Sequence, residues 1–443
     1  MHKFIGIRRE DKNRWERRSP LIPQHVRELK QEHSIETVVQ PSPIRSFSDD
    51  EYLDAGATVQ DDLSPCPIIF AIKEIPSSFF EQKKTYAFFS HTIKGQQYNM
   101  PMLKKLMELE CQLIEYERIV DSQGKRLIAF GKYAGMAGMI DTFWALGKKL
   151  SREGIDNPFT LVEQTVQYES LEAAKMGIGR AAQAIERDGI AALLSPLIFG
   201  IAGYGNVSKG AQEILDLLPI HTITPRDVRS FSSGHTYSSN RVYKVVFKEE
   251  DTVEPVSEGE FELHDYYRHP EKYRSRFHTY LPHLSVLLNG IYWDERYPRL
   301  VTKAGLRSLF EKGKPRLRVI TDVSCDVEGS VECTLRHTTP GSPVYTYDPL
   351  ADRAEDGFEG TGPLVIAVDN LPCELPTASS RYFSEILKRY VPGIVHADFS
   401  RDLDSCGLPP PIRKGVIVYH GHLTPEYRYI QSFVERYGER GTK

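Results

Sequence analysis

The chain has 443 residues, which predicts two or three domains, because a single hydrophobic core stops growing at roughly 250–300 residues. Its 56 basic and 60 acidic residues give a net charge of −4, which argues against a nucleic-acid-binding protein. Apolar residues make up 40% of the chain and 32 residues are glycine, so disordered and collagen-like chains are excluded.

The sequence contains no uninterrupted apolar run of the roughly 18 residues that a membrane helix needs, so we expect no membrane partner. Residues 1–7 lack the apolar core and cleavage site of a signal peptide. Six cysteines are scattered along the chain without a CxxC pair. This pattern favours a reducing, cytoplasmic location. We predict packing roles for the cysteines and no metal site.

Short apolar runs alternate with helical stretches from the N-terminus onward, which is typical of a largely parallel α/β fold. The predicted strands of the first domain are residues 4–7, 37–39, 68–72, 86–89 and 112–116. Apolar residues repeat at helical spacing from Met102 to Leu109, between the last two strands. These elements predict a doubly wound domain.

A helix over residues 135–150 leaves this domain, and its small residues Gly135, Ala137 and Gly138 would let it approach another helix closely. A second α/β unit begins near Pro196. Its predicted strands are residues 197–202, 221–224, 286–288, 317–321 and 364–368. Residues 226–282 are polar, and we interpret them as an insertion. Helices are predicted over residues 382–390 and 425–437.

The clearest local signal is a glycine-rich turn within residues 197–211. A buried strand runs into Gly203 and Gly205, and an amphipathic helix follows. Such glycines permit a tight turn and let backbone N–H groups reach a pyrophosphate at a helix N-terminus. Ser208 replaces the third glycine of the strict pattern, so an ordinary strand-to-helix turn is the alternative interpretation.

The residues after the next predicted strand bear on the choice of dinucleotide. An NAD-binding fold usually carries Asp or Glu there, whereas residues 221–226 contain no acid. A missing carboxylate removes repulsion against a 2′-phosphate, with which Arg226 or Arg229 would pair. The sequence therefore favours NADPH over NAD. Asp322, which ends a later strand, either faces the cofactor or is a loop acid.

Polar side chains follow four predicted strands of the first domain. In chain order they are Arg18, Lys73 with Glu74, His91 with Gln96, and Glu117 with Arg126 and Phe130. In open α/β sheets, ligands bind beyond the carboxyl ends of the strands. Each residue alone fits an ordinary loop or salt-bridge role. Together they predict a cationic pocket of acids and bases, suited to a small substrate with several carboxylates.

Several segments carry a resemblance to a known family. They include Glu16-Arg17-Arg18-Ser19-Pro20, Lys73-Glu74, Phe89-Ser90-His91, Phe130-Gly131-Lys132-Tyr133, Gly205-Asn206-Val207-Ser208-Lys209-Gly210 and Asp369-Asn370-Leu371-Pro372. They resemble the lysine-ketoglutarate reductase half of bifunctional aminoadipic semialdehyde synthase over residues 4–392. The fungal lysine-forming saccharopine dehydrogenases and, more remotely, alanine dehydrogenase are similar as well.

The resemblance implies an oxidoreductase of lysine metabolism, in which L-lysine condenses with 2-oxoglutarate and NADPH reduces the imine to saccharopine. It implies that Lys73 and His91 are the catalytic acid/base pair. The substrate-binding residues that it implies are Arg18, Glu74, Gln96, Glu117, Arg126 and Phe130. The residues expected on the cofactor side are Gly203, Gly205, Asn206, Val207, Arg226 and Asp322.

The resemblance also implies two Rossmann-like doubly wound domains with a cleft between them, the first of them discontinuous. Residues 1–140 and 370–443 would form the substrate domain, and residues 141–369 the dinucleotide-binding domain. The bifunctional enzymes continue into a saccharopine-oxidising half, whereas this chain ends at Lys443. We therefore expect a stand-alone reductase or one part of a pathway.

Three alternatives stay open at this point. The first is the same chemistry with another amine or another 2-oxo acid. The second is a non-catalytic dinucleotide-binding sensor, against which the joint presence of Lys73, His91, Glu117 and Arg126 argues. The third is an alanine-type dehydrogenase. In each case we expect small-molecule partners, and the sequence makes no prediction of oligomeric state.

Overall fold

The computed structural model describes residues 3–233 and 237–438 and divides into two compact units. Unit 1 comprises residues 1–130 and 376–443, and unit 2 comprises residues 131–375. Parts of the predicted ranges, namely residues 1–2, 234–236 and 439–443, lie outside the described residues. Among the helices of the described ranges, none has the length and apolar character needed to cross a membrane.

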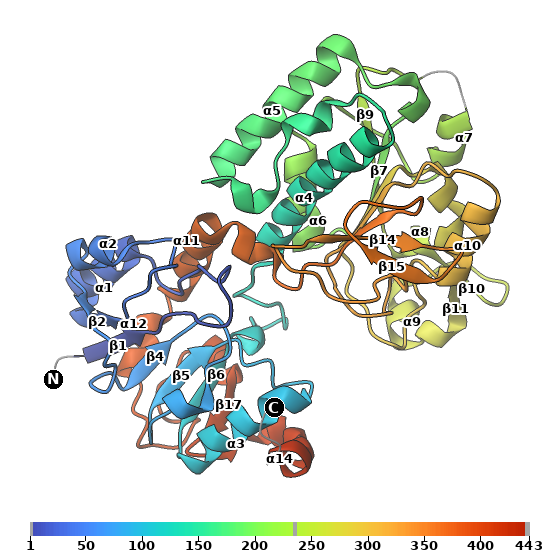
Figure 1. Ribbon diagram of the computed structural model, residues 1–443. Helices are drawn as coiled ribbons and strands as arrows, with labels where there is room; N and C mark the ends of the chain where they lie inside the picture. Colours follow the sequence, from blue (N-terminus) through green and yellow to red (C-terminus); the bar gives the residue numbers. More distant parts are fainter. Residues whose placement is uncertain (1–2, 234–236, 439–443) are drawn as a thin grey trace. The chain divides into compact units, whose positions relative to one another are not determined.

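Unit 1 is built on an eight-stranded sheet with the order β18-β17-β6-β5-β4-β1-β2-β3 (Figure 1). The strands are β1 (Lys3–Ile7), β2 (Ile35–Val39), β3 (Thr58–Val59), β4 (Ile68–Phe70), β5 (Thr85–Phe88), β6 (Gln112–Glu115), β17 (Val416–Tyr419) and β18 (His422–Leu423). Strands β1 to β6 pair in parallel, whereas β17 pairs antiparallel with β6. The C-terminal segment therefore completes a sheet that the N-terminal segment begins.

Helices of unit 1 come from both ends of the chain. They are α1 (Pro23–His33), α2 (Asp49–Asp54), α3 (Met100–Glu108), α11 (Pro376–Leu387), α12 (Val391–His396), α13 (Pro410–Lys414) and α14 (Gln431–Tyr437). Helix α3 confirms the predicted helical spacing, because Met102, Leu103 and Leu106 form its buried face.

Unit 2 also has an eight-stranded sheet, with the order β15-β14-β16-β13-β12-β7-β9-β8 (Figure 1). The strands are β7 (Ile198–Ala202), β8 (Ile220–Thr222), β9 (Val242–Phe247), β12 (Val286–Asn289), β13 (Val319–Asp322), β14 (Val344–Asp348), β15 (Arg353–Asp356) and β16 (Leu364–Ile366). A separate two-stranded sheet pairs β10 (Val253–Pro255) with β11 (Tyr273–Ser275). Two parallel-dominated sheets confirm the α/β fold class.

Strand β9 corrects two of the predictions made from the sequence. It lies inside residues 226–282, so this stretch is not a simple insertion. It pairs in parallel with β7 on one side and with β8 on the other. The strand beside the glycine turn is therefore β9, while β8, near the predicted strand at residues 221–224, lies at the sheet edge.

The helices of unit 2 are α4 (Gly131–Arg152), α5 (Leu171–Asp188), α6 (Asn206–Leu215), α7 (Val228–Ser233), α8 (Glu249–Thr252), α9 (Leu263–Arg268) and α10 (Lys303–Glu311). Helices α4 and α6 cross with their backbones in contact. A Cβ atom at Gly135 would lie 1.8 Å from the Val207 carbonyl oxygen, and one at Gly210 would lie 1.9 Å from the Lys132 carbonyl oxygen. The close approach predicted at Gly135 is therefore confirmed.

The junctions between the units lie at residues 130/131 and 375/376, whereas the sequence placed them near residues 140 and 370. Helix α4 is continuous from Gly131 and packs on α6, so the whole helix belongs to unit 2. The short helix η10 (Leu371–Glu374) packs against α4 and extends unit 2 at its other end.

Candidate active site

Polar residues of unit 1 lie along one edge of its sheet. Strands β1, β4, β5 and β6 are neighbours and run parallel, so their carboxyl ends meet at this edge. Ligands of open α/β sheets bind at such an edge. The predicted alignment of strand ends in this unit is therefore present.

Glu74, which follows β4, connects two basic side chains. Its Oε1 atom lies 2.7 Å from Nδ1 of His91, and its Oε2 atom accepts a hydrogen bond of 2.9 Å from Nζ of Lys12. Burial acts to raise the pKa of Glu74, but the hydrogen bond and charge of His91, with the charges of Lys12 and Lys73, outweigh it. The pKa of Glu74 is thus held well below its ordinary value, and Glu74 is a carboxylate at neutral pH.

Lys73 has the environment of a reactive amine. Its side chain is 9% exposed, and among the described residues its ammonium group has no hydrogen-bond or ion-pair partner. Burial, together with repulsion from Arg18 and Lys12, lowers the pKa of Lys73. The lowered pKa increases the fraction of neutral amine that can accept a proton.

Arg18 is buried and held in a fixed orientation. Its Nε and Nη2 atoms donate to the two carboxylate oxygens of Glu16 at 2.7 and 2.6 Å. The guanidinium carbon lies 4.2 Å from the centre of the Phe130 ring, which stacks on Phe383 at 4.8 Å. The C-terminal helix α11 therefore supplies Phe383 to support two residues predicted from the N-terminal part of the chain.

Three further predicted residues lie at or beyond the next strand ends. Glu117 accepts a hydrogen bond of 3.0 Å from Arg126, whose side chain is 45% exposed. Gln96 precedes the short helix η2 (Gln97–Asn99), and its buried Oε1 atom has no hydrogen-bond partner among the described residues. A cavity of about 620 Å³ adjoins Glu74 and Lys12. A bound substrate could donate the hydrogen bond that the Oε1 atom of Gln96 lacks.

Two buried carboxylates were not identified from the sequence. Glu10 accepts hydrogen bonds from the backbone N–H groups of Ile72 at 2.6 Å and Lys73 at 3.0 Å. Glu115 accepts them from Ser90 at 2.7 Å and His91 at 3.2 Å. An acid directly after the apolar pair Leu113 and Ile114 of β6 was the available signal for Glu115. The role of Glu115 depends on strand order, because its partners Ser90 and His91 follow the neighbouring strand β5.

The glycine turn of unit 2 lines a cavity of about 420 Å³. Gly203 adopts a φ of +94°, a conformation that favours glycine, and Gly205 caps the N-terminus of α6. The first backbone N–H groups of a helix, here those of Asn206 and Val207, have no partner within the helix and can bind phosphate. The turn therefore fits the pyrophosphate of a dinucleotide.

Glu249 lines the same cavity, just after β9. Its Oε1 atom accepts a hydrogen bond of 2.7 Å from the Tyr267 hydroxyl, while its Oε2 atom is buried with no partner among the described residues. The neighbouring Lys248 is 56% exposed and lies 3.7 Å from Glu250. In nucleotide-binding folds an acid at this place accepts hydrogen bonds from the adenosine ribose.

The structure does not bring two of the predicted cofactor residues to this cavity. Arg226 is exposed and follows β8 at the sheet edge, because β9 takes the place beside β7. Asp322 is completely buried and accepts hydrogen bonds from Asn289 at 2.9 Å and Thr334 at 2.7 Å. Asp322 therefore connects β13 to β12 within the protein core.

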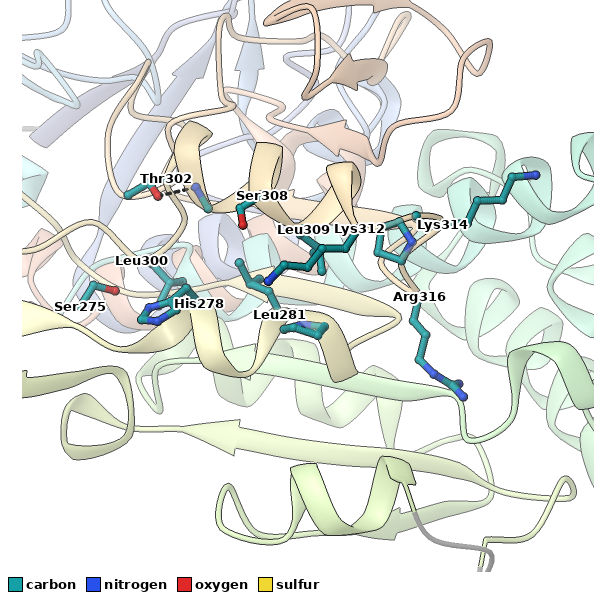
Figure 2. Close-up of a pocket in the computed structure, with 14 residues that line it drawn as sticks. Ser275, His278, Leu281, Leu300, Thr302, Ser308, Leu309, Lys312, Lys314 and Arg316 are labelled. Atoms are coloured by element: carbon teal, nitrogen blue, oxygen red, sulfur yellow. Dashed lines mark hydrogen bonds between the residues drawn. The ribbon is translucent and has the colours of Figure 1, made fainter.

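Another cavity of unit 2, of about 510 Å³, is shown in Figure 2. Its residues Leu281 and Arg316 precede β12 and β13, so it lies at the edge of the sheet opposite the glycine turn. The Arg316 guanidinium extends away from the other labelled polar groups and donates to the Ser195 carbonyl oxygen at 3.2 Å. The described residues that line it include no carboxylate, so it lacks the acid/base set found in unit 1.

Comparisons with known proteins agree with this architecture. Residues 6–137 match the alanine dehydrogenase/PNT N-terminal domain, and residues 276–426 match the C-terminal domain of the same family. A solved L-alanine dehydrogenase superposes with a TM-score of 0.63 at 17% identity, covering 97% of this chain and 99% of that one. That likeness establishes the fold.

Two relatives are similar in sequence along most of the chain. The mitochondrial α-aminoadipic semialdehyde synthase of Mus musculus is 36% identical over 449 residues, covering 98% of this chain and 48% of that protein. The chain therefore spans about half the length of this relative. The NAD(+)-dependent, L-lysine-forming saccharopine dehydrogenase of Emericella nidulans is 26% identical over 407 residues, covering 86% of this chain and 90% of that protein. The chain belongs to the alanine dehydrogenase/PNT family, whose N-terminal and C-terminal domain models both match it.

Proposed function

We propose that the chain is an NAD(P)-dependent oxidoreductase that condenses the ε-amine of L-lysine with 2-oxoglutarate and reduces the resulting imine to saccharopine. The observation that carries this proposal is the cluster of Lys73, Glu74 and His91 at the sheet edge of unit 1. It is supported by the glycine-turn cavity of unit 2, which fits a dinucleotide, and by the two relatives.

The charges of unit 1 suit these substrates. Saccharopine carries three carboxylates, and Arg18, Arg126 and Lys12 would bind such groups as bidentate or point-charge partners. Glu117 would hold the α-ammonium group of the amino-acid substrate.

Imine formation needs a base at the amine and an acid at the carbonyl oxygen. Lys73, whose pKa is lowered by burial, would take the proton from the substrate ε-ammonium. His91, hydrogen-bonded through Nδ1 to Glu74, would protonate the carbinolamine oxygen, which leaves as water. Each such transfer contributes about 10²–10⁴ to the rate. When bound, the reduced dinucleotide would supply the hydride that converts the imine, protonated on its nitrogen, to a secondary amine.

We further propose that the cofactor is NAD(H) rather than NADP(H). The sequence favoured NADPH because no acid followed the predicted strand at residues 221–224. The position beside β7 belongs to β9, which Glu249 follows. The unpartnered, buried Oε2 atom of Glu249 would accept a hydrogen bond from a ribose hydroxyl but would repel a 2′-phosphate.

The proposed activity is tested by following oxidation of NADH and NADPH with lysine and 2-oxoglutarate together, and with each omitted in turn. We expect oxidation only when both substrates are present. Oxidation only with a different amine or 2-oxo acid would show that lysine and 2-oxoglutarate are not the substrates. Tight dinucleotide binding without oxidation by any candidate pair would identify a sensor instead.

A further inference from the structure

We infer that Glu10 and Glu115 are positioning residues, whose buried carboxylates hold the backbone at Lys73 and His91 and so fix the directions of these two side chains. The inference rests on the proposed function, since it takes Lys73 and His91 as the acid/base pair.

Glu115 joins the ends of two neighbouring strands. It lies at the end of β6, is completely buried, and directs Oε2 toward the residues that follow β5. This atom accepts hydrogen bonds from the backbone N–H groups of Ser90 at 2.7 Å and His91 at 3.2 Å, and from the Ser90 hydroxyl. Its Oε1 atom accepts from the backbone N–H of Glu117 at 2.9 Å. One carboxylate therefore fixes three backbone N–H groups at the sheet edge.

The backbone of His91 needs this support. Its φ of +48° lies in the left-handed region, which is strained for a residue with a Cβ atom. In this conformation the imidazole lies 6.1 Å from the Phe89 ring, nearly parallel to it, and places Nδ1 2.7 Å from Glu74. Release of the N–H from Glu115 would let the backbone relax and turn the imidazole away from Glu74.

Glu10 makes the same arrangement at the neighbouring strand. It follows β1, is 6% exposed, and accepts hydrogen bonds from the backbone N–H groups of Ile72 and Lys73, one with each oxygen. These bonds tie the end of β4 to the end of β1. They fix the Cα–Cβ direction of Lys73, whose amine has no partner of its own among the described residues.

The test is a double-mutant cycle with Glu115→Gln and His91→Asn. Asparagine tolerates the left-handed backbone, so His91→Asn removes the imidazole and keeps the fold. Glu115→Gln puts an amide N–H₂ in place of one accepting oxygen at unchanged volume. We expect Glu115→Gln to lower kcat by about tenfold or more with little change in KM, because a small misplacement of a catalytic group is enough for such a loss. In the His91→Asn background it should lower kcat no further.

If Glu115 has only a structural role, Glu115→Gln lowers kcat by the same factor in the wild-type and His91→Asn backgrounds. That result would overturn the inference. Unchanged kcat in Glu115→Gln overturns it as well. The matched control is Glu81→Gln, at a partly exposed acid of the same unit, which should leave kcat unchanged. Glu10→Gln is tested in the same way against Lys73→Met. If Glu115→Gln does not fold, Glu115→Asp, which withdraws the carboxylate by one methylene, takes its place.

A second readout separates this inference from the proposed function. The NMR signals of the His91 imidazole in the full chain can be recorded without turnover. We expect Glu115→Gln to shift these signals, because the ring would leave its place beside Phe89 and Glu74, whereas Glu81→Gln should leave them unchanged. A wild-type chain without lysine-dependent oxidation would refute the proposed function. Unchanged imidazole signals of His91 in Glu115→Gln would refute the positioning role.

Discussion

The two residues proposed for proton transfer, Lys73 and His91, have different surroundings. Lys73 is desolvated and surrounded by Arg18 and Lys12, so its neutral form is favoured. His91 has a carboxylate partner in Glu74, whose Oε1 atom lies 2.7 Å from Nδ1 of the imidazole. A desolvated amine and an imidazole paired with a carboxylate, at neighbouring strand ends, would suit a reaction that needs a base and an acid together.

Removal of either group should lower turnover strongly and leave cofactor binding nearly unchanged. We expect Lys73→Met and His91→Ala each to lower kcat by about 10²–10⁴. Dinucleotide affinity should stay within about twofold of wild type, because the glycine-turn cavity lies in unit 2. Steady-state kinetics and fluorescence titration measure the two quantities. Lys105→Met, at an exposed lysine of α3, is the control. Near-normal rates in both variants would contradict the assignment of Lys73 and His91 as the acid/base pair.

Glu249 should determine the choice of dinucleotide. We expect the wild-type chain to bind NADH more tightly than NADPH, and Glu249→Ser to weaken NADH binding by about tenfold while NADPH binding becomes stronger. Equilibrium fluorescence titration gives both constants, with Glu250→Ser as the matched control. A wild-type preference for NADPH that Glu249→Ser leaves unchanged would contradict this role.

At the scale of elements, α4 and η10 pack together and each contributes a buried acid, Asp141 from α4 and Glu374 from η10. Asp141 of α4 accepts hydrogen bonds from the backbone N–H and the hydroxyl of Thr165 at 2.9 and 2.7 Å. Burial, together with the nearby charge of Asp141, raises the pKa of Glu374 well above its ordinary value of 4.5. Glu374 is therefore protonated in the folded chain over a range of pH in which it is ionised when unfolded.

This shift predicts how the stability of unit 2 depends on pH. Because the folded pKa of Glu374 is raised, its contribution to the free energy of unfolding is complete below pH 4.5 and is lost as the pH rises toward the folded pKa. Glu374→Gln carries no such proton, so its unfolding free energy should fall less steeply with pH. Denaturant unfolding at several pH values measures this, with the exposed Glu258→Gln as control. If the unfolding free energies of wild type and Glu374→Gln depend on pH with the same slope, the pKa of Glu374 is not raised in the folded chain.

Strands that consist of a short run of apolar residues could be predicted from the sequence alone. The strands that end before Lys73, His91 and Glu117 are short buried runs, and their apolar residues are enough to find them. Strand β9 was missed because Lys244 interrupts its apolar run. The Lys244 side chain is only 7% exposed and bonds to Asp216 at 2.5 Å, a pairing between distant segments.

The same reason explains the site residues that were missed. Glu10, Glu115 and Glu249 act on residues of neighbouring strands, so their roles depend on strand order rather than on nearby sequence. Gly210 is a glycine whose importance the sequence pattern does not indicate. The turn departs from the strict glycine pattern at Ser208, and the position that actually needs glycine is set by the crossing of α6 with α4.

At the scale of the whole molecule, the chain passes between two units twice, and each unit holds half of the proposed chemistry. Unit 1, made from both ends of the chain, carries the acid/base groups, and its C-terminal segment adds β17 beside β6. Unit 2 is one continuous segment and carries the dinucleotide cavity. We propose that the chain uses both units to join two carbon skeletons through a nitrogen atom.

The most direct test is a reaction with lysine labelled with ¹⁵N at the ε position, 2-oxoglutarate and the reduced dinucleotide, followed by mass spectrometry of the product. We predict one product that contains both carbon skeletons and retains the label, in an amount equal to the dinucleotide oxidised. An unlabelled amino acid formed from 2-oxoglutarate and free ammonia, or oxidation without any joined product, would contradict the account.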